Sequence, residues 1–335
     1  MSKILIIRLS AIGDVAMTIP VIYSAASANP KDSFTVLTQT FLMPLFINHP
    51  PNVNVMGVNT KMSEKSFFGF IRYALILRMY KFDIVLDLHN VIRSRIVDII
   101  FHLQRKKIFR INKMYRERKK LIARPPKEIH PLRPVVERYV EVFHAAGINF
   151  EETFVSLYAD NAFAKEKKGI WLGIAPFAKH KGKIYPIEKM EKIVETLSEK
   201  EGVTIFLFGG SGEEEKVLGR WEGKFKNTTN VIGRYSLDME LSLISNLDLM
   251  ISMDSANMHL ASLVNTPVIS IWGATHPFAG FYGFNQDESN IVHIDMPCRP
   301  CSIYGDKPCY RNDYACMKQI TPEMIVEKVQ AILSI

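Results

Sequence analysis

ILIIRLSAIGD, residues 4–14, is the stretch that decides how this chain folds. Its first four residues form a continuous apolar run, which is typical of a parallel strand covered on both faces. The run leads through small residues to Gly13 and Asp14, where the backbone can approach a ligand and a carboxylate can face it. The stretch has one glycine and so lacks the three-glycine fingerprint of a dinucleotide site. Asp14 is therefore either a helix N-cap or a group that meets a substrate at the carboxyl end of the first strand.

The same pattern returns along the chain, where short apolar runs alternate with amphipathic stretches. Runs of four to six residues predict buried strands over Ile4–Ile7, Phe34–Leu37, Ile84–Leu88, Trp171–Ala175, Val203–Phe208, Leu249–Ser252 and Val268–Trp272. Helical spacing covers Met190–Leu197, Leu237–Ser245 and Met258–Val264. This order predicts an α/β fold of doubly wound parallel sheets, which bind ligands at the carboxyl ends of their strands.

The length of 335 residues is enough for about two domains, each with its own core. A polar stretch without clear periodicity, Asp160–Lys168, separates the halves, and each half begins with a strand. We therefore predict two Rossmann-like domains, residues 1–160 and 169–320, that face each other across a cleft. Residues 321–335 predict a final helix, because Thr321 suits an N-cap and Pro322 the first helical position.

The composition excludes several classes of protein. Hydrophobic residues make up 47% of the chain and charged residues 23%, a balance that excludes wholesale disorder and fibrous structure. No apolar run reaches the ~20 residues that span a bilayer, and the N-terminus lacks the apolar core of a signal peptide. We therefore expect a cytoplasmic protein.

The net charge of +8 is concentrated in one segment, Arg105–Lys127. Eleven basic residues and one acid, Glu117, give this segment +10 and leave −2 for the rest of the chain. Such a concentration favours a local anionic partner. Nucleic acid, an anionic lipid surface and a phosphorylated substrate all fit it, and a solvated basic loop is the alternative.

Three loops of the second half follow predicted strands and carry small or charged residues. Gly209–Glu215 is a glycine-rich turn that would expose backbone N–H groups to a ligand, although many strand-to-helix turns share this composition. In Met253–Ala261 small residues predict the N-terminus of a helix, with Asp254 just before the helix and His259 about one turn after its start. His259 is either a buried core histidine or a catalytic group. A flexible ammonium able to neutralise a departing diphosphate is offered by Lys179, Lys181 and Lys183.

Taken in order, these motifs resemble those of glycosyltransferase family 9, the ADP-heptose:lipopolysaccharide heptosyltransferases. The matching positions are Ser10-Ala11-Ile12-Gly13-Asp14 with Thr18 and Pro20, Asp83 to Leu88 with Arg93-Ser94, His130 with Arg138-Tyr139, Lys183-Ile184-Tyr185-Pro186, Gly209 to Glu213, Asp254-Ser255 with His259 and Ala261, and Trp272 to Pro277. They cover nearly the whole chain, and their order is more specific than any single motif. The resemblance implies a GT-B fold, an acceptor bound mainly by the N-terminal half and a nucleotide sugar bound by the C-terminal half. It also implies inverting transfer that needs no metal.

The resemblance implies roles for individual residues as well. Asp14 matches the catalytic base, and Lys183 matches the lysine that contacts the diphosphate and ribose. Glu213 matches the acid that holds the ribose hydroxyls, and Tyr235 lies where the backbone meets adenine. Asp254 matches a residue near the sugar hydroxyls. Further donor-binding positions at the phosphate-binding helix start are Ser255, Ala256, Asn257 and His259.

The chain also departs from the family pattern. Ala178 and Lys179 stand where hydroxyl residues commonly touch the phosphates, Ala256 replaces a glycine, and His89 stands where glutamine is frequent. These changes leave the reaction class intact but bear on which sugar and nucleotide are used. Another nucleotide sugar and a different envelope glycan are the alternative within the family.

Elementary chemistry agrees with an inverting transfer. A single displacement at the anomeric carbon needs one base for the acceptor hydroxyl and positive charge for the leaving diphosphate. The chain contains no Asp-x-Asp pair, the usual carboxylate clamp for Mg²⁺ or Mn²⁺. We therefore expect the positive charge to come from Lys183 and the helix start after Asp254, with no cofactor required for catalysis.

The expected acceptor is an anionic lipopolysaccharide precursor. Candidate acceptor-binding residues are Ser10, Gly13, Arg93, Lys113, Arg116 and Lys120. The basic segment Arg105–Lys127, with its interspersed apolar residues, would also dock the protein peripherally on the inner-membrane surface. No nucleic-acid motif accompanies the basic residues, so we expect no nucleic-acid partner.

All four cysteines lie close together in the sequence, at Cys298, Cys301, Cys309 and Cys316. One C-x₂-C pair followed by two spaced cysteines permits a structural zinc site. Reduced thiols without metal are the alternative for a cytoplasmic protein. A non-catalytic binding protein with a zinc-clamped loop and a basic face is accordingly the second functional hypothesis.

Overall fold

The computed structural model describes residues 1–59, 67–158 and 167–335. These residues form two compact units, of which the first comprises residues 1–113 and 134–155 and the second 114–133 and 156–335. Residues 114–133 lie inside the predicted first domain but belong to the second unit. Most of the predicted linker, Asp160–Lys168, lies outside the described residues.

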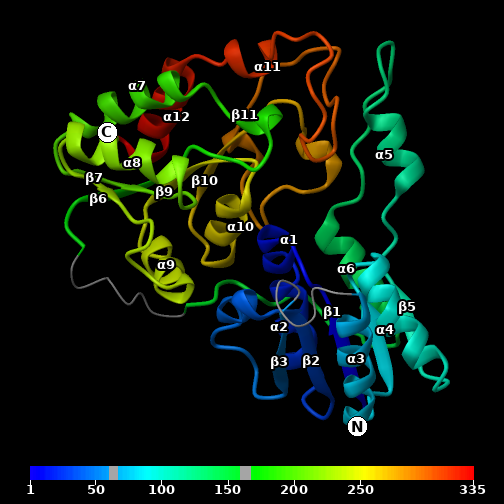
Figure 1. Cartoon of the computed structure of the whole chain (residues 1–335). Helices are drawn as coiled ribbons and strands as arrows, with labels where there is room; N and C mark the ends of the chain where they lie inside the picture. Colours follow the sequence, from blue (N-terminus) through cyan, green and yellow to red (C-terminus); the bar gives the residue numbers. More distant parts are fainter. Residues whose placement is uncertain (60–66, 159–166) are drawn as a thin grey trace. The chain divides into compact units, whose positions relative to one another are not determined.

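The first unit contains a five-stranded sheet in the order β3-β2-β1-β4-β5, in which every pairing is parallel (Figure 1). Its strands are β1 Lys3–Ile7, β2 Ser33–Gln39, β3 Val53–Val58, β4 Ile84–Asp87 and β5 Lys107–Arg110. Its helices are α1 Ile12–Ala16, α2 Ile19–Ala28, α3 Phe67–Ile76, α4 Ile92–His102 and α6 Val135–Ala145, with 3₁₀ turns η1 Thr40–Leu45 and η2 Leu77–Tyr80.

The helices cover both faces of this sheet. The connections from β3 to β4 and from β4 to β5 run in the same direction across the sheet, so right-handed crossovers place α3 and α4 on one face. There Leu5 and Ile7 of β1 pack in one cluster with Phe70 of α3 and Phe101 of α4. The connection from β1 to β2 runs the other way and places α2, which contacts α6, on the opposite face.

The second unit contains a six-stranded parallel sheet in the order β11-β10-β9-β6-β7-β8. Its strands are β6 Ile170–Ala175, β7 Val203–Leu207, β8 Thr228–Asn230, β9 Leu249–Met253, β10 Val268–Ile271 and β11 Ile291–Val292. Its helices are α5 Tyr115–Leu121, α7 Ile187–Ser198, α8 Glu213–Lys224, α9 Leu237–Ile244, α10 Ala256–Leu263, α11 Ala315–Lys318 and α12 Pro322–Leu333, with 3₁₀ turns η3 Lys181–Lys183, η4 Pro277–Ala279 and η5 Glu288–Asn290.

The core of this unit lies between the sheet and helices α7, α8 and α12. Leu172 and Ile251 of the sheet share a buried cluster with Met190 of α7, Trp221 of α8 and Val329 of α12. The predicted final helix is confirmed as α12, and the Thr321 hydroxyl accepts a hydrogen bond from the Met324 amide at 3.4 Å.

All seven predicted strands are confirmed, whereas β3, β5, β8 and β11 are absent from the prediction. These four are the outermost strands of the two sheets. An edge strand is covered less completely than a central one and keeps polar residues, as the half-exposed Lys107–Arg110 of β5 illustrates. The continuous apolar run that signals a buried strand is therefore missing at the edges.

Among the residues that the structure describes, no helix combines the length and the apolar character that crossing a bilayer requires.

Candidate active site

The carboxyl end of β1 brings Arg8 and Asp14 together. The Arg8 guanidinium lies 2.8 Å from the Asp14 carboxylate and also donates to the Leu88 carbonyl oxygen at 2.8 Å. The same carboxylate oxygen of Asp14 accepts a hydrogen bond from the Ala11 amide at 3.2 Å. Arg8 is buried and Asp14 is half-buried. The arginine therefore holds the carboxylate from its buried side, and part of the Asp14 side chain remains exposed to solvent. The sequence analysis did not single out Arg8, which the structure places against the candidate base Asp14.

His89 lies beside this ion pair. Its Nδ1 accepts a hydrogen bond from the Leu9 amide at 3.4 Å. Burial, together with the nearby charges of Arg8 and Lys113, lowers the pKa of His89 to about 3. The imidazole is therefore neutral at physiological pH, and because Nδ1 is an acceptor its proton sits on Nε2. Position 89 thus supplies a neutral hydrogen-bond donor near Asp14.

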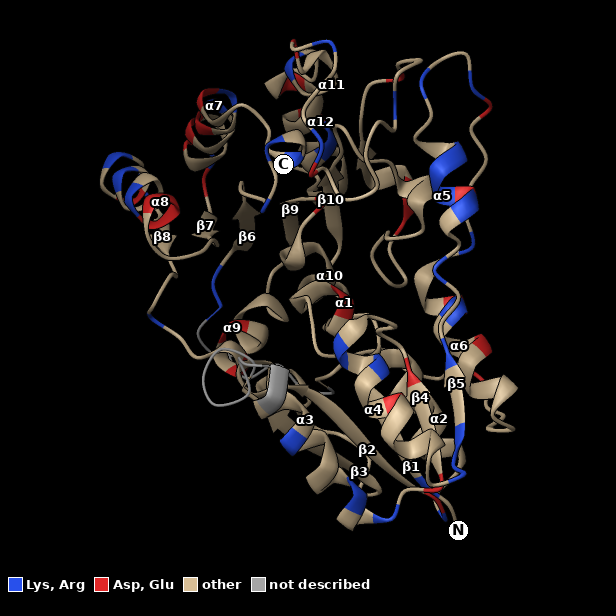
Figure 2. Ribbon diagram, turned by 45° about the vertical axis from the view of Figure 1, so that its right-hand side comes forward, with Lys and Arg blue, Asp and Glu red and all other residues tan. Residues whose placement is uncertain are grey.

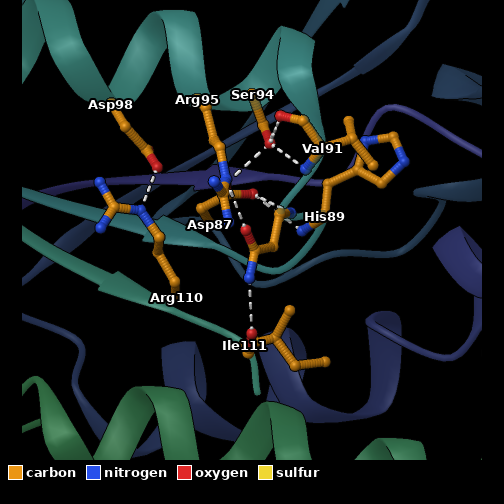
Figure 3. Close-up of polar contacts among 9 residues, drawn as sticks. Asp87, His89, Val91, Ser94, Arg95, Asp98, Arg110 and Ile111 are labelled. Atoms are coloured by element: carbon orange, nitrogen blue, oxygen red, sulfur yellow. Dashed lines mark hydrogen bonds and ion pairs between the residues drawn. The ribbon is translucent and has the colours of Figure 1, made fainter. Parts of the chain in front are cut away.

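The loop that carries His89 is fastened by Asp87, the last residue of β4 (Figure 3). One oxygen of the fully buried Asp87 carboxylate accepts from the His89 amide at 2.9 Å and the Asn90 amide at 2.7 Å. The other accepts from the Ser94 hydroxyl at 2.7 Å. The predicted Asp87 and Ser94 motif therefore shapes the turn between β4 and α4 and positions His89.

A second buried carboxylate, Asp98 of α4, lies near Asp87 and pairs with Arg110 Nε at 2.5 Å (Figure 3). Burial and the neighbouring negative charge of Asp87 together raise the pKa of Asp98 to about 6, although Arg110 opposes the rise. Asp98 has no side-chain exposure. This group therefore acts through the packing of α4 against β4 rather than through contact with a substrate.

The predicted acceptor-binding residues divide between the two units. Ser10 and Lys113 are half-buried and Gly13 is buried in the first unit, and Arg93 is exposed at the start of α4. Arg116 and Lys120 are exposed on α5, which belongs to the second unit. The first four candidates therefore lie on the unit that carries Asp14, and the last two do not.

Part of the basic segment Arg105–Lys127 is used inside the second unit. Arg118 is buried, donates to the Tyr304 hydroxyl at 2.7 Å and lies 5.2 Å above the Phe281 ring. Lys127 Nζ donates to the backbone oxygens of Leu121 at 3.0 Å and Cys298 at 3.3 Å. These cations hold α5 to its own unit, so the segment is not one uniform anion-binding surface.

Lys183 and Asp254 form the main ion pair of the second unit. Lys183 Nζ lies 2.9 Å from the Asp254 carboxylate, and the same oxygen accepts from the Thr275 hydroxyl at 2.7 Å. Asp254 follows β9 and Lys183 ends η3, so two loops at the carboxyl edge of the sheet meet here. The predicted diphosphate lysine and sugar-binding aspartate are thus brought together.

The loop that supplies Thr275 is held by Arg299, which the sequence analysis also missed. Arg299 is almost fully buried and donates to the carbonyl oxygens of Trp272 at 3.3 Å and Thr275 at 3.1 Å. The same region approaches the lysine, because a Cβ at Gly305 would lie 2.6 Å from Lys183 Cγ. Residues 299–305 therefore fix the loops around Lys183 and Asp254.

The remaining donor candidates surround other strand ends of the second unit. Helix α10 begins at Ala256 after the N-cap Ser255, whose side chain makes no capping hydrogen bond in the described chain, and His259 is buried one turn further on. Glu213 begins α8, is exposed and pairs with Lys216 at 2.6 Å. The other candidates are half-buried or exposed, namely Ala178, Lys179, Tyr235 and Asn257.

Within the described residues, one group of three side chains has metal-ligand spacing: His276, His293 and Asp295, whose ligand atoms lie within 4.8 Å of one another. His276 Nδ1 accepts from the Phe278 amide at 3.1 Å, and His293 Nδ1 accepts from Arg299 at 3.1 Å. Each ring therefore carries its proton on Nε2, the atom that would have to bind the metal. The charge of Arg299 disfavours a cation here as well, so the trio does not fit a metal site.

The four cysteines are free thiols, two of them buried. A tetrahedral zinc–thiolate site needs sulfur atoms about 3.8 Å apart, but among the residues that the structure describes no three of these sulfurs lie within 4.8 Å of one another. Burial raises the pKa of Cys316 to about 11, which favours the protonated thiol. This arrangement does not fit a closed zinc site, and zinc binding stays a prediction.

Comparison with known proteins finds a family whose sequence model this chain matches. The model of a family described as glycosyltransferase family 9 (heptosyltransferase) matches residues 71–308. A lipooligosaccharide heptosyltransferase 2 of Campylobacter jejuni is 24% identical over 334 residues, which cover 96% of this chain and 95% of that protein.

Solved structures share the fold. A family 9 glycosyl transferase from Veillonella parvula superposes with a TM-score of 0.77 at 17% identity, covering 99% of this chain and 97% of that one. The Escherichia coli heptosyltransferase WaaC with ADP-2-deoxy-2-fluoro heptose gives 0.67 at 19% identity, covering 90% and 97%. These likenesses and the two parallel-sheet units confirm the predicted GT-B fold.

Proposed function

Because the chain belongs to glycosyltransferase family 9, the heptosyltransferases, we propose that it transfers a heptose from ADP-heptose to a lipopolysaccharide core acceptor. The family makes the chain a glycosyltransferase, so the hypothesis of a non-catalytic binding protein is set aside. The ADP-2-deoxy-2-fluoro heptose in the E. coli WaaC structure supports the donor class. The name of the Campylobacter relative supports the acceptor class.

The observation that carries the proposal is the Arg8–Asp14 pair at the end of β1. Aspartate is ionised at neutral pH, and a carboxylate that is fixed in orientation and partly exposed can accept the proton of an acceptor hydroxyl. The acceptor oxygen then bonds to the anomeric carbon while the carbon–oxygen bond to ADP breaks. The proton moves to Asp14, ADP leaves with the bonding electrons, and the anomeric configuration inverts.

The second unit supplies charge for the leaving group. A departing diphosphate gains negative charge in the transition state, and a lysine ammonium together with free N–H groups at a helix start can stabilise it. Lys183 and the first turn of α10 are such groups, and the chain has no Asp-x-Asp pair to hold a divalent cation. We therefore propose that transfer is metal-independent.

Asp254 is proposed to position Lys183 rather than to react with the sugar. It is buried beneath Lys183 and also accepts from Thr275, so it is poorly placed to attack a sugar carbon. A two-step retaining mechanism would need a second exposed carboxylate as nucleophile. The burial of Asp254 supports a one-step displacement in which this residue positions Lys183.

The acceptor is proposed to be anionic and lipid-linked. Arg93, Lys113 and His89 lie on the unit that carries Asp14 and can hold its phosphates and hydroxyls. A lipid-linked acceptor would bring the enzyme to a membrane surface, so we also propose peripheral association with the inner membrane.

Two measurements test this function. The first incubates the purified chain with ADP-heptose and a heptose-deficient lipopolysaccharide, and the expected result is ADP release with a gain of one heptose in the acceptor mass. The second is a thermal-shift screen of ADP, UDP and GDP, with selective stabilisation by ADP expected. A preference for UDP or GDP would overturn the donor assignment and favour another nucleotide sugar and a different envelope glycan.

A separate proposal concerns structural zinc, which rests on the spacing of the four cysteines in the sequence; zinc binding would have to draw their sulfur atoms closer together than they lie in this structure. Elemental analysis of the purified chain should then give about one zinc per molecule, and Cys298→Ser should release it. Metal-free protein of unchanged thermal stability would reject zinc and leave four reduced thiols.

A further inference from the structure

The outward face of α4 is apolar. Ile92 and Leu103 are each 78% exposed and Ile99 is 59% exposed. At about 100° of rotation per residue these three side chains and the half-buried Ile96 fall within an arc of about 60°. Val97 and Phe101 on the opposite side of the helix are buried in the core of the first unit. The helix therefore has two apolar faces, and only one of them is needed for packing.

The neighbouring segment repeats this feature. Helix α3 packs beside α4, since Phe70 and Ala74 share a buried cluster with Phe101. Both helices cover the same face of the sheet, so their outer surfaces form one layer. On that layer the end of α3 and η2 expose Leu75, Ile76, Met79 and Tyr80.

Lys and Arg residues occur along α3 and α4, in the same segments as these apolar residues (Figure 2). The basic residues of 67–106 are exposed or half-buried, and they are Arg72, Arg78, Lys81, Arg93, Arg95, Arg105 and Lys106. Of the three acids in this range, Asp87 and Asp98 are buried. The third, Asp83, is paired with Lys106 at 3.5 Å. We call this surface, formed by the outer faces of α3, η2 and α4, the helical platform.

An apolar stripe flanked by cations selects among the partners that could cover it. A second copy of the chain would place two cationic platforms against each other, which their charge disfavours. Nucleic acid would take the cations but leave seven large apolar side chains without a partner. An anionic bilayer accepts both, since the side chains enter the acyl boundary and the cations meet the headgroups.

We propose that the helical platform docks the first unit on an anionic lipid surface. This inference rests on the proposed function, because a lipid-linked acceptor is what brings the enzyme to a membrane. It also moves the docking surface away from α5, where Arg118 and Leu121 are buried within the second unit.

The position of the platform has a consequence for the acceptor. Ile92 begins α4 next to the loop of His89, at the sheet edge where Asp14 lies, and Leu103 follows α4 at the opposite edge. Docking along this stripe lays the α3–α4 layer on the lipid and brings the loop of His89, which adjoins Ile92, close to the headgroups. An acceptor sugar attached to lipid can then meet Asp14 without leaving the membrane.

The test is co-sedimentation of the full chain with vesicles of equimolar phosphatidylethanolamine and phosphatidylglycerol. Vesicles of phosphatidylcholine alone provide the uncharged comparison. We expect binding to the anionic vesicles that weakens with added salt, by roughly fivefold in partition for each cation near the surface. Equal binding to both vesicle types, or binding to an oligonucleotide in their place, would overturn the proposal.

Matched variants locate the surface. Ile99→Gln combined with Leu103→Gln should lower vesicle partition by about tenfold or more, because both side chains would enter the acyl boundary. The control is Met239→Gln combined with Met324→Gln, which changes two exposed apolar residues of the second unit and should leave partition unchanged. Loss in Arg116→Gln combined with Lys120→Gln, with none in the α4 variant, would assign docking to α5 and contradict the platform.

An activity assay separates this inference from the proposed function. With a detergent-dispersed acceptor, the Ile99→Gln and Leu103→Gln variant should transfer heptose at the wild-type rate, because both side chains are exposed on the outer face of the α4 segment rather than at the carboxyl edge of the sheet, where Asp14 lies. A wild-type chain that transfers heptose but does not bind anionic vesicles would reject the docking surface alone. A chain that binds vesicles but transfers nothing would reject the function alone.

Discussion

The two units present opposite members of similar ion pairs. In the first unit Arg8 and Asp14 lie 2.8 Å apart, and the carboxylate is the outer member, with side-chain exposures of 10% and 26%. In the second unit Lys183 and Asp254 lie 2.9 Å apart, and the cation is the outer member, with exposures of 16% and 7%. One unit therefore exposes the negative member of its pair and the other exposes the positive member.

The inner member of each pair is fixed by a second hydrogen bond. Arg8 donates to the Leu88 carbonyl oxygen, and Asp254 accepts from the Thr275 hydroxyl. A charge that is buried and fixed on one side can orient its partner without moving itself. The comparison shows that an ion pair with one buried and one exposed member can serve two different roles in the proposed reaction. In the first unit it provides a base for the acceptor, and in the second unit it provides a cation for the leaving diphosphate.

Removing the outward carboxylate should give the largest effect. Asp14→Ala is expected to lower the rate of heptose transfer by at least ~10²-fold while donor affinity stays unchanged, as loss of a general base predicts. Steady-state kinetics and calorimetric titration with ADP-heptose check this. Asp83→Ala at the other end of β4 is the matched control, and near-normal turnover in Asp14→Ala would break the comparison.

Removing the outward cation should cost less but should also weaken donor binding. Lys183→Met is expected to lower kcat/KM by about 10- to 100-fold, because other positive groups at the α10 start remain. ADP affinity should fall with it, whereas Lys192→Met on the exposed side of α7 should change neither. Full ADP affinity in Lys183→Met would show that this lysine does not face the diphosphate.

Removing a hydrogen bond to Asp254, the buried member of the second ion pair, should have a smaller and indirect effect on transfer. Thr275→Val removes one of the two donors to Asp254 and is expected to cost about 1–2 kcal/mol in the free energy of unfolding. Transfer should fall several-fold through misplacement of Lys183. Urea unfolding and kinetics of the same preparation test this. A fully active variant with unchanged stability would show that Thr275 does not position Asp254 and Lys183.

The smallest effect is expected at Asp98, a carboxylate without an outward role. Its pKa in the folded chain is raised to about 6, above its ordinary value, so the protonated form stabilises the fold. This contribution is present below about pH 4 and is lost as the pH rises through about 6. The free energy of unfolding should therefore decline over that range in the wild type and less in Asp98→Asn. An identical slope in both proteins would reject the assignment.

The central strands could be predicted from the sequence because full burial leaves a continuous apolar run, as in Ile4–Ile7. The edge strands could not, since β5 carries charged residues at both ends and β8 is three polar residues, Thr228–Asn230. Edge pairing depends on the neighbouring strand, which lies far away in the sequence, rather than on a local pattern.

The candidate site could be located from the sequence where a residue belongs to a motif, as for Asp14, Lys183 and Asp254, which the structure places in ion pairs near strand ends and whose roles stay predictions. It was not predictable where a residue acts through distant partners. Arg118 meets Tyr304, which lies 186 residues further along the chain, and this contact turns part of a predicted anion-binding segment into internal packing. Arg8 had a usable signal, because a charged residue directly after a buried strand needs a partner near the strand end.

The stereochemistry of the product tests the central claim most directly, because a single displacement with Asp14 as the base inverts the anomeric carbon without a covalent intermediate. The anomeric configuration of the transferred heptose is measured by nuclear magnetic resonance and compared with that of the ADP-heptose donor. The ion-pair account predicts an inverted configuration. A retained configuration would exclude a single displacement and would contradict the role given to Asp14 as the base.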